Sequence, residues 1–167
     1  MEKITVRRYT QEDGEKLALL FYETVHTVNA KDYTAVQLEA WAPKRRDQKE
    51  WNRSFMAHIS YVAVKENVIV GFGDIDDEGY LDRLYVHRDY QRHGVGTALC
   101  NVLENAIQTP EILTHASITA RPFFEKRGYR TVKEQQVERE GVLLTNFVMK
   151  KTGSKRLEGE RCFSGFI

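Results

Sequence analysis

The residues best suited to chemistry lie in one turn in the middle of the chain. Gly94 and Gly96 open a predicted helix directly after a predicted strand. A helix begins with unpaired backbone amides and a partial positive charge, so its first turn favours a phosphate group. Glycine at both positions lets the backbone approach an anion without a Cβ in the way. Arg92 adds positive charge just before them, so the turn predicts a phosphate-binding site.

Two common phosphate-binding motifs do not fit this turn. A Walker loop needs Lys and then Ser or Thr after its last glycine, and Gly96 is followed by Thr97 and Ala98. A dinucleotide fingerprint needs a third small residue where Leu99 stands, and it belongs to the first strand–helix unit of a domain. The plain alternative is a glycine turn that only starts a helix.

A second motif follows, made of a small residue, an aromatic pair, an acidic–basic pair and a glycine with an aromatic residue. Its members are Ala120, Phe123, Phe124, Glu125, Lys126, Gly128 and Tyr129. With both motifs the chain resembles the GNAT superfamily of acetyl-CoA-dependent N-acetyltransferases over residues 4–150. The superfamily's first motif is Gln/Arg-x-x-Gly-x-Gly/Ala after a hydrophobic strand, and Gln91, Gly94 and Gly96 fill it.

Three further stretches resemble the YafP-like bacterial branch of this superfamily. They are Tyr33-Thr34 with residues 37–43, residues 116–125, and Thr145-Asn146-Phe147. The resemblance to this branch implies a small-molecule amine acceptor.

The resemblance also implies where acetyl-CoA, the cosubstrate, would bind. The strand before the turn parts from its neighbour in this family and pairs with the pantetheine arm through its backbone, here at Leu84, Tyr85 and Val86. The other expected cofactor-binding residues are Gln91, Arg92, His93, Gly94, Val95, Gly96, Thr97, Ser117 and Phe124. The adenosine end could contact Arg88, Arg121 or Lys126, which could equally be plain surface charges. No metal is expected.

Acetyl transfer to an amine needs a base or a water relay, because a primary amine has an unperturbed pKa of about 10.4. By resemblance, Tyr80 stands where several family members place a base. An ideal strand puts Asp82 on the face of Tyr80, Leu84 and Val86, one pleat nearer the cofactor than Tyr80. We therefore expect Asp82 and Tyr80 to be catalytic. The alternatives are an ion pair of Asp82 with Arg83 or another basic neighbour, and a packed ring for Tyr80.

Phe124 departs from the family pattern. Many members carry Tyr there to protonate the leaving thiolate, and Ser117 stands where Asn is common. A thiol of pKa about 8.5 leaves tolerably without help, so loss of this acid slows turnover without abolishing it. Water, Ser117 and Tyr129 all remain open as the acid.

The acceptor pocket is expected between the early helices and the parted strands. Its expected lining is aromatic: Tyr22, His26, Tyr33, Trp41 and Trp51. Such a pocket suits a flat or hydrophobic acceptor, or a cationic amine held by cation–π contact. The alternative is that these rings only anchor the short helices on the sheet.

The elements that position these residues follow from periodicity and turn signals. Strands are predicted over residues 4–9, 61–64, 68–73, 80–87, 112–117, 129–138 and 142–149. Helices are predicted after Thr10 with Asp13, after Thr34 with Gln37, over 49–58, from Gly94 to near Pro110, and over 121–127. This order predicts an α+β fold, and the resemblance implies a central, mixed, mostly antiparallel and splayed sheet with helices on both faces. One acetyltransferase domain is expected over residues 1–150, with a loosely structured tail over 151–167.

Composition narrows the classes of partner. The chain has 167 residues with 25 Lys+Arg against 24 Asp+Glu, a net charge of +1 that requires neither nucleic acid nor an anionic membrane. The basic run Lys44-Arg45-Arg46 is expected to be a solvated turn. Cys100 and Cys162 fit neither metal-ligand spacing nor a disulfide framework. With no apolar signal region or membrane-spanning run, we expect a cytoplasmic protein. A homodimer is left open.

The expected function is direct acetyl transfer from acetyl-CoA to a small amine-like acceptor. A covalent route is not expected, because Cys100 is predicted to be buried in a helix. One rival is an acetyl-CoA-binding sensor or regulatory protein with weak or no catalysis, which Phe124 and Ser117 favour. Another is a protein or peptide N-acetyltransferase, whose acceptor groove should be open and acidic.

Overall fold

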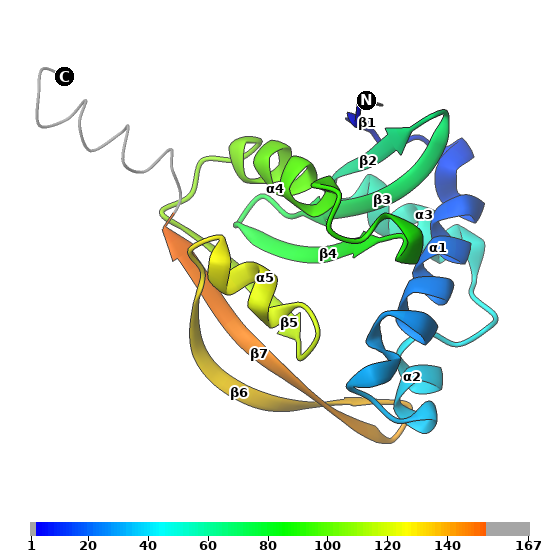
Figure 1. Cartoon of the computed structure of the whole chain (residues 1–167), viewed down its shortest axis with the longest axis vertical. Helices are drawn as coiled ribbons and strands as arrows, with labels where there is room; N and C mark the ends of the chain where they lie inside the picture. Colours follow the sequence, from blue (N-terminus) through cyan, green and yellow to red (C-terminus); the bar gives the residue numbers. More distant parts are fainter. Residues whose placement is uncertain (1–2, 153–167) are drawn as a thin grey trace, which may run out of the picture.

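The computed structural model describes residues 3–152 of the chain, in which seven strands form one sheet in the order β1-β2-β3-β4-β5-β7-β6 (Figure 1). The strands are β1 (Thr5–Arg8), β2 (Ile59–Lys65), β3 (Val68–Ile75), β4 (Tyr80–Val86), β5 (Glu111–Ser117), β6 (Arg130–Arg139) and β7 (Val142–Thr152). All neighbours are antiparallel except β4 and β5, which are parallel. The predicted mixed, mostly antiparallel sheet is confirmed.

Helices cover both faces of this sheet. They are α1 (Gly14–Thr27), α2 (Ala35–Trp41), α3 (Gln48–Met56), α4 (Val95–Asn105) and α5 (Arg121–Lys126), with short 3-10 turns η1 (Gln11–Asp13), η2 (Asn29–Lys31) and η3 (Arg88–Tyr90). One core cluster joins α4 and α5 to the sheet, with Leu99, Leu103 and Phe124 fully or almost fully buried. The other joins α1 and α3 to the opposite face, through Leu17 and Phe55. In Figure 1, α4 and α5 lie in front of the sheet and α3 lies behind it.

The predicted helix starts are confirmed by their capping geometry. Thr34 Oγ1 accepts from the Gln37 N–H at 3.2 Å, and Gln37 Oε1 accepts from the Thr34 N–H at 2.8 Å, so α2 begins with a reciprocal capping box. The box of Thr10 and Asp13 is also present, but it opens η1, which leads into α1. Asp47 caps α3 through its carboxylate, which the sequence analysis did not anticipate.

The sheet splays in its middle, as the resemblance implied. Strands β4 and β5 pair at Tyr80 with Leu113 and at Leu81 with Thr114, and at no later position among residues 3–152. Thr114 Oγ1 fixes this short contact by donating to the Leu81 carbonyl at 2.9 Å. Strand β4 nevertheless stays paired with β3 as far as Val86. A gap therefore opens between β4 and β5 towards the end of β4.

The largest differences from the predicted boundaries are at the ends of α4 and β7. Helix α4 ends at Asn105 rather than near Pro110. Strand β7 extends to Thr152, so Lys151 and Thr152 belong to the sheet and not to the tail, because they pair with Ile112 and Glu111 on β5. The rest of the expected tail, with Cys162, lies outside the described residues.

The hairpin of β6 and β7 curls from the edge of the sheet towards α2 (Figure 1). Its turn, Glu140-Gly141, has positive φ at both residues, the conformation that a two-residue hairpin turn favours. The side chain of Gln37 donates to the Leu143 carbonyl at 2.9 Å and so joins the hairpin to α2. Within residues 3–152, no helix has both the length and the apolar character needed to cross a membrane.

Candidate active site

The predicted phosphate-binding turn connects β4 to α4. Gly94 caps α4 with φ at +84°, a left-handed conformation that favours glycine, and a Cβ there would meet nothing within 4 Å. The structure gives a further reason for glycine at position 96, besides the predicted approach of an anion. A Cβ at Gly96 would lie 3.2 Å from the Phe123 ring, so this glycine lets α4 and α5 approach each other.

The backbone of β4 turns hydrogen-bonding groups into the gap at alternate residues. The His87 N–H donates to the Val70 carbonyl at 2.8 Å, and Val86 lies opposite Gly71. Because antiparallel pairs alternate, Val86 and Leu84 direct their N–H and C=O groups away from β3. The backbone of Tyr85 faces β3 instead, so Tyr85 was wrongly included among the residues that pair with the cofactor.

Gln91 supports the turn from within. Its side-chain amide donates to the Val86 carbonyl at 2.6 Å, so it fixes the end of β4 relative to the turn. The Val86 N–H has no such partner among the described residues. The neighbouring side chains of Arg92 and His93 are exposed, as is that of Thr97 in the first turn of α4.

A β-bulge at Asp82 changes which residues share a face. Asp74 lies opposite Arg83 and Ile75 opposite Leu81, so Asp82 has no partner on β3. The extra residue reverses the alternation of side chains along β4. The prediction that one face carries Tyr80, Asp82, Leu84 and Val86 is therefore wrong: Leu84 and Val86 pack with the α4 cluster, whereas Tyr80 and Asp82 line a pocket with Arg83 and Tyr85.

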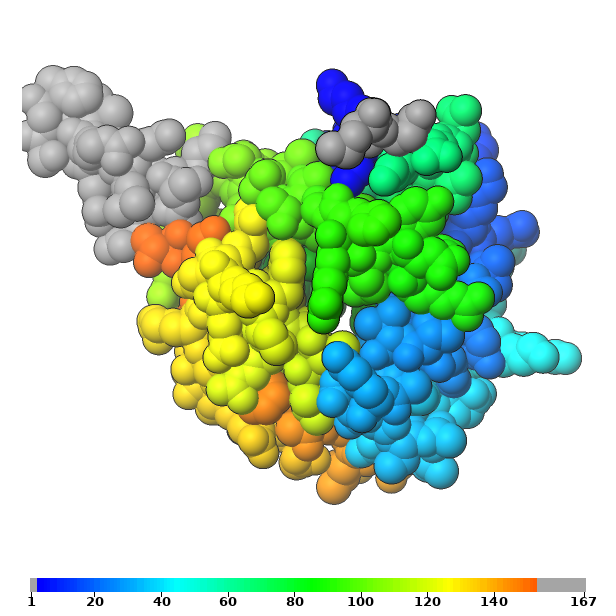
Figure 2. All heavy atoms as spheres, viewed as in Figure 1, coloured from blue at the N-terminus to red at the C-terminus, as the bar shows by residue number. Residues whose placement is uncertain are grey.

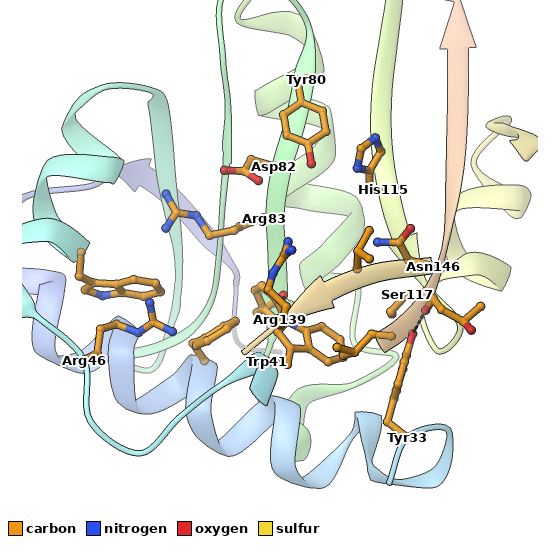
Figure 3. Close-up of a pocket in the computed structure, with 16 residues that line it drawn as sticks. Tyr33, Trp41, Arg46, Tyr80, Asp82, Arg83, His115, Ser117, Arg139 and Asn146 are labelled. Carbon is orange, nitrogen blue, oxygen red and sulfur yellow. Dashed lines mark hydrogen bonds between the residues drawn. The ribbon is translucent and has the colours of Figure 1, made fainter. Parts of the chain in front are cut away.

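This pocket has a volume of about 270 Å³ and lies where the early helices face the parted strands (Figure 3). Besides the four residues of β4, it is lined by Phe21, Tyr33, Trp41, Arg46, Trp51, His115, Ser117, Val137, Arg139, Leu144, Thr145 and Asn146. On the face seen in Figure 2, the surface is hollowed where the green segment of α4, the yellow segment of α5 and the blue segment of α1 and α2 meet.

The expected aromatic lining is partly right. Tyr33, Trp41 and Trp51 line the pocket. Tyr22 and His26 do not, because their rings pack against each other with centroids 4.2 Å apart and His26 Nε2 lies 2.8 Å from the Ala42 carbonyl oxygen. These two residues secure α1 to the end of α2.

The charge environment separates the possible bases. Burial is the main cause that raises the pKa of Asp82, and the negative charge of Asp74 is the second. The raised pKa makes this carboxylate a better base than a solvated one. Burial raises the pKa of Tyr80 to about 12, so its phenol is neutral at physiological pH and a poor base. Burial lowers the pKa of His115, which favours a neutral imidazole that can accept a proton.

Of the two ion-pair alternatives for Asp82, Arg83 is not the partner, whereas another basic neighbour, His58, lies within ion-pair distance. Arg83 donates instead to both carboxylate oxygens of Asp74, at 3.0 and 2.6 Å. His58 Nδ1 lies 2.8 Å from Asp74 and 4.0 Å from Asp82. His58, Asp74 and Asp82 bring ligand-type atoms within 4.8 Å of one another, but both oxygens of Asp74 already accept hydrogen bonds from Arg83, so ion pairing explains the cluster.

Of the three possible acids, the structure removes one. The Tyr129 hydroxyl donates to Glu104 at 2.7 Å in the core, where burial and the carboxylate raise its pKa, so it is not available to a ligand. Ser117 lines the pocket, and its Oγ accepts from the Ala120 N–H at 3.0 Å. Phe124, expected among the cofactor-binding residues, is 3% exposed and packs between Phe123 and Tyr129; its contact with the cofactor stays a prediction.

The cysteine in α4 is unsuited to covalent chemistry. Cys100 is buried, as predicted, and burial raises the pKa of its thiol to about 12. A thiol with so high a pKa supplies almost no thiolate at neutral pH.

Three ionisable residues that line the pocket were not predicted from the sequence. His115 had a signal, since it lies two residues before Ser117 on a predicted strand and therefore shares its face. Arg46 had none: the solvated-turn interpretation holds for Lys44 and Arg45, but Arg46 turns inwards over the Trp51 and Phe21 rings, at 4.4 and 4.9 Å. Arg139 reaches the pocket only because the hairpin curls.

Comparison with known proteins decides the family. A family model described as an acetyltransferase (GNAT) domain matches residues 29–151. The N-acetyltransferase YafP of Escherichia coli K12 is 36% identical over 150 residues, which cover 90% of this chain and 97% of that protein. The chain belongs to the GNAT family of acetyltransferases.

Solved GNAT structures share the whole fold. A GCN5-related N-acetyltransferase from Rhodopseudomonas palustris matches with a TM-score of 0.85 and 31% identity, over 91% of this chain and 97% of that one. The PaiA N-acetyltransferase of Thermoplasma acidophilum, solved in complex with coenzyme A, has a TM-score of 0.70 and 18% identity, over 90% and 99% of the two chains. The resemblance read from the two motifs is confirmed, and the protein is an acyltransferase of the acetyl-CoA-dependent type.

The residues of this GNAT chain fit acetyl-CoA. The left-handed Gly94 and the exposed turn before α4 leave helix-start amides accessible, and the Val86 N–H points into the gap between β4 and β5. The assignment of individual side chains such as Arg92 and His93 to the cofactor stays a prediction.

Proposed function

We propose that this chain transfers an acetyl group directly from acetyl-CoA to a small amine held in the pocket of Figure 3. One observation carries the proposal. Side chains of both β4 and β5 line the pocket, at the place where these strands part and the Val86 N–H faces the gap. An acceptor in the pocket would therefore meet a thioester in the gap.

When bound, acetyl-CoA supplies the acetyl thioester. The Val86 N–H is the donor available to polarise the carbonyl oxygen, and the backbone amides at the start of α4 are available to the phosphates. Gln91 contributes by holding the end of β4 in place through the Val86 carbonyl.

We assign the base to Asp82. Its raised pKa suits proton transfer better than that of a solvated carboxylate, and it lies in the same pocket as His115 and Tyr80. In the overall step the amine nitrogen bonds to the acetyl carbon, the carbon–sulfur bond breaks, and the amine proton passes to Asp82 directly or through water. The thiolate leaves with its electron pair and takes a proton from water or Ser117.

The size of the pocket supports a small acceptor over a protein. Its volume of about 270 Å³ lies near the lower end of small-molecule sites, which span roughly 300–1,000 Å³.

We also propose that the protein is cytoplasmic. Size-exclusion chromatography of the purified protein would measure its oligomeric state.

The test is release of free thiol when the enzyme and acetyl-CoA meet a panel of primary amines, with mass spectrometry to identify the N-acetyl product. Turnover on small amines supports the proposal. Faster turnover on peptide N-termini would assign the protein to the peptide acetyltransferases. Tight binding of acetyl-CoA with no turnover on any amine would favour the sensor, which the absence of a hydroxyl at Phe124 makes a real alternative.

A further inference from the structure

The pocket contains more positive charge than its own carboxylates neutralise. Asp82 is the one carboxylate among the residues that line it, against the guanidinium groups of Arg46, Arg83 and Arg139. Arg83 is already neutralised by Asp74, which accepts two of its hydrogen bonds. Two guanidinium groups therefore face one carboxylate.

Arg46 is the more constrained of the two. It is half-buried and lies over the faces of Trp51 and Phe21, and it has no carboxylate partner within residues 3–152. Burial is the main cause that lowers the pKa of Arg46, and the neighbouring positive charge of Arg83 is the second. Both effects indicate a cation without a compensating anion. Cations that are removed from water are normally paired, so this guanidinium is poised to bind an anion.

Arg139 provides the second charge from the far side. Figure 3 shows it reaching from the hairpin into the middle of the pocket. Its charge contributes to lowering the pKa of His115 and opposes the rise in the pKa of Tyr80, so it lies near both groups. Its guanidinium has one hydrogen bond in the described part of the chain, to the Glu138 carbonyl.

The same arrangement corrects the expectation of a cationic acceptor held by aromatic rings. The rings of Trp51 and Phe21 are already covered by Arg46, and the other arginine, Arg83, lies 5.1 Å from the Trp51 centroid. The protein's own guanidinium groups thus occupy the cation–π positions on Trp51 and Phe21. They also repel any cationic group placed at this end of the pocket.

We infer that the acceptor is an amine that also carries an anionic group, a carboxylate or a phosphate, which Arg46 binds. The amine then lies at the other end, towards Asp82 and His115, and the aromatic walls contact the part of the acceptor between them. A guanidinium held flat against a ring presents its edge to such an anion and can bind two of its oxygens at once. This inference rests on the proposed function.

The test uses pairs of amines that differ by one anionic group. 4-(Aminomethyl)benzoate is compared with benzylamine to test a carboxylate, and 2-aminoethylphosphonate with ethylamine to test a phosphate-like group. The variants are Arg46→Gln and Arg46→Met, the second of which keeps an apolar stem against Trp51. Arg45→Gln removes the same charge one residue earlier from an exposed side chain and is the matched control.

Binding can be measured without turnover, because the chain has two tryptophans, Trp41 and Trp51, and both line the pocket. Quenching of their fluorescence reports occupation of the pocket. In the wild-type enzyme and in Arg45→Gln, the anionic member of at least one pair should bind and react better than its neutral partner. In both Arg46 variants its KM and Kd should rise by about 10- to 100-fold, more than those of the neutral partner, with the KM for acetyl-CoA unchanged.

The outcomes separate the inference from the proposed function. Preference for the neutral amines, or a rise in the KM for acetyl-CoA in place of that for the acceptor, overturns the inference while acetyl transfer stands. Another outcome is that the anionic amines quench the fluorescence of the wild-type enzyme but not that of Arg46→Met, with no thiol released from acetyl-CoA. That result supports the anion site although the transferase proposal fails. Which pair responds decides between a carboxylate and a phosphate.

Discussion

The hydroxyl of Tyr33 donates a hydrogen bond to the Thr145 carbonyl at 2.7 Å (Figure 3). The same oxygen accepts from the Ile118 N–H at 2.9 Å. One side chain therefore joins the loop before α2 to the hairpin and to the chain just after β5. All three of these segments border the acceptor pocket.

Replacing Tyr33 with Phe should loosen this junction. The variant removes both hydrogen bonds and leaves a partly buried N–H unpaired, so the free energy of unfolding should fall by about 1–3 kcal/mol. The KM for the acceptor should rise more than the KM for acetyl-CoA. Urea unfolding and steady-state kinetics measure the two effects. Tyr22→Phe, outside the pocket, is the control and should change stability by less than about 0.5 kcal/mol; equal effects would contradict the role given to Tyr33.

Asp82→Asn should lower kcat by about 100-fold or more, because general base catalysis typically contributes 10²–10⁴-fold. The variant should also lose the fall in kcat/KM on the acid side of the pH profile. His115→Asn should keep that limb with a smaller loss of rate. Should His115→Asn alone remove the acid limb, the base is the histidine.

His58→Gln tests the ion pair with Asp74. The hydrogen bond with Asp74 raises the pKa of His58, so its contribution to stability is fully present below the unfolded value of about 6.5 and is lost as the pH rises through the raised folded value. The variant should therefore lose more free energy of unfolding at pH 6 than at pH 9. Chemical unfolding at both pH values measures this, and a loss of equal size at both would refute it.

Lys151→Met should destabilise the fold although the residue lies past the expected end of the domain. Lys151 Nζ lies 3.0 Å from Glu104, a carboxylate only 8% exposed, so its loss should cost about 1–3 kcal/mol. Lys150→Met is the matched control, since its partner Glu111 is solvated and 3.7 Å away, and it should cost less than about 0.5 kcal/mol. Urea midpoints of the two full-length variants compare them.

Cys100→Ala should keep turnover. A thiol with a pKa of about 12 in the core cannot act as the nucleophile, so kcat should stay within about twofold while stability falls by about 1 kcal/mol. Intact-protein mass spectrometry after mixing with acetyl-CoA should detect no acetylated enzyme. Accumulation of an acetyl adduct that the variant lacks would establish the covalent route instead.

Local signals in the sequence predicted the fold and the turn correctly. The capping pair of Thr34 with Gln37 and the glycine turn that opens α4 depend on a few neighbouring residues, so the sequence alone reveals them. The bulge at Asp82 depends on the register between β3 and β4, which no local pattern encodes, and one extra residue reversed the facing of Leu84 and Val86.

The pocket was harder to predict than the turn for a similar reason. Arg46 and Arg139 are separated by 93 positions in the sequence, and they line one pocket only because the loop before α3 turns inwards and the hairpin curls. His115 could have been found, since the facing of Ser117 was already assigned. Tyr22 and His26 were misplaced because an amphipathic helix does not tell which of its partly buried residues face a ligand and which face the next helix.

The position of α4 on the opposite side of the sheet from α1 and α3 has a consequence for how this enzyme could diversify. The turn for the shared cosubstrate packs with α4, whereas the pocket draws on α1, α2, α3 and the far end of the hairpin. Substitutions or changes of length around Glu140 and Gly141 would move Arg139 and leave the Gly94 turn untouched. Preference for a new acceptor could thus evolve without any loss in the recognition of the acetyl donor.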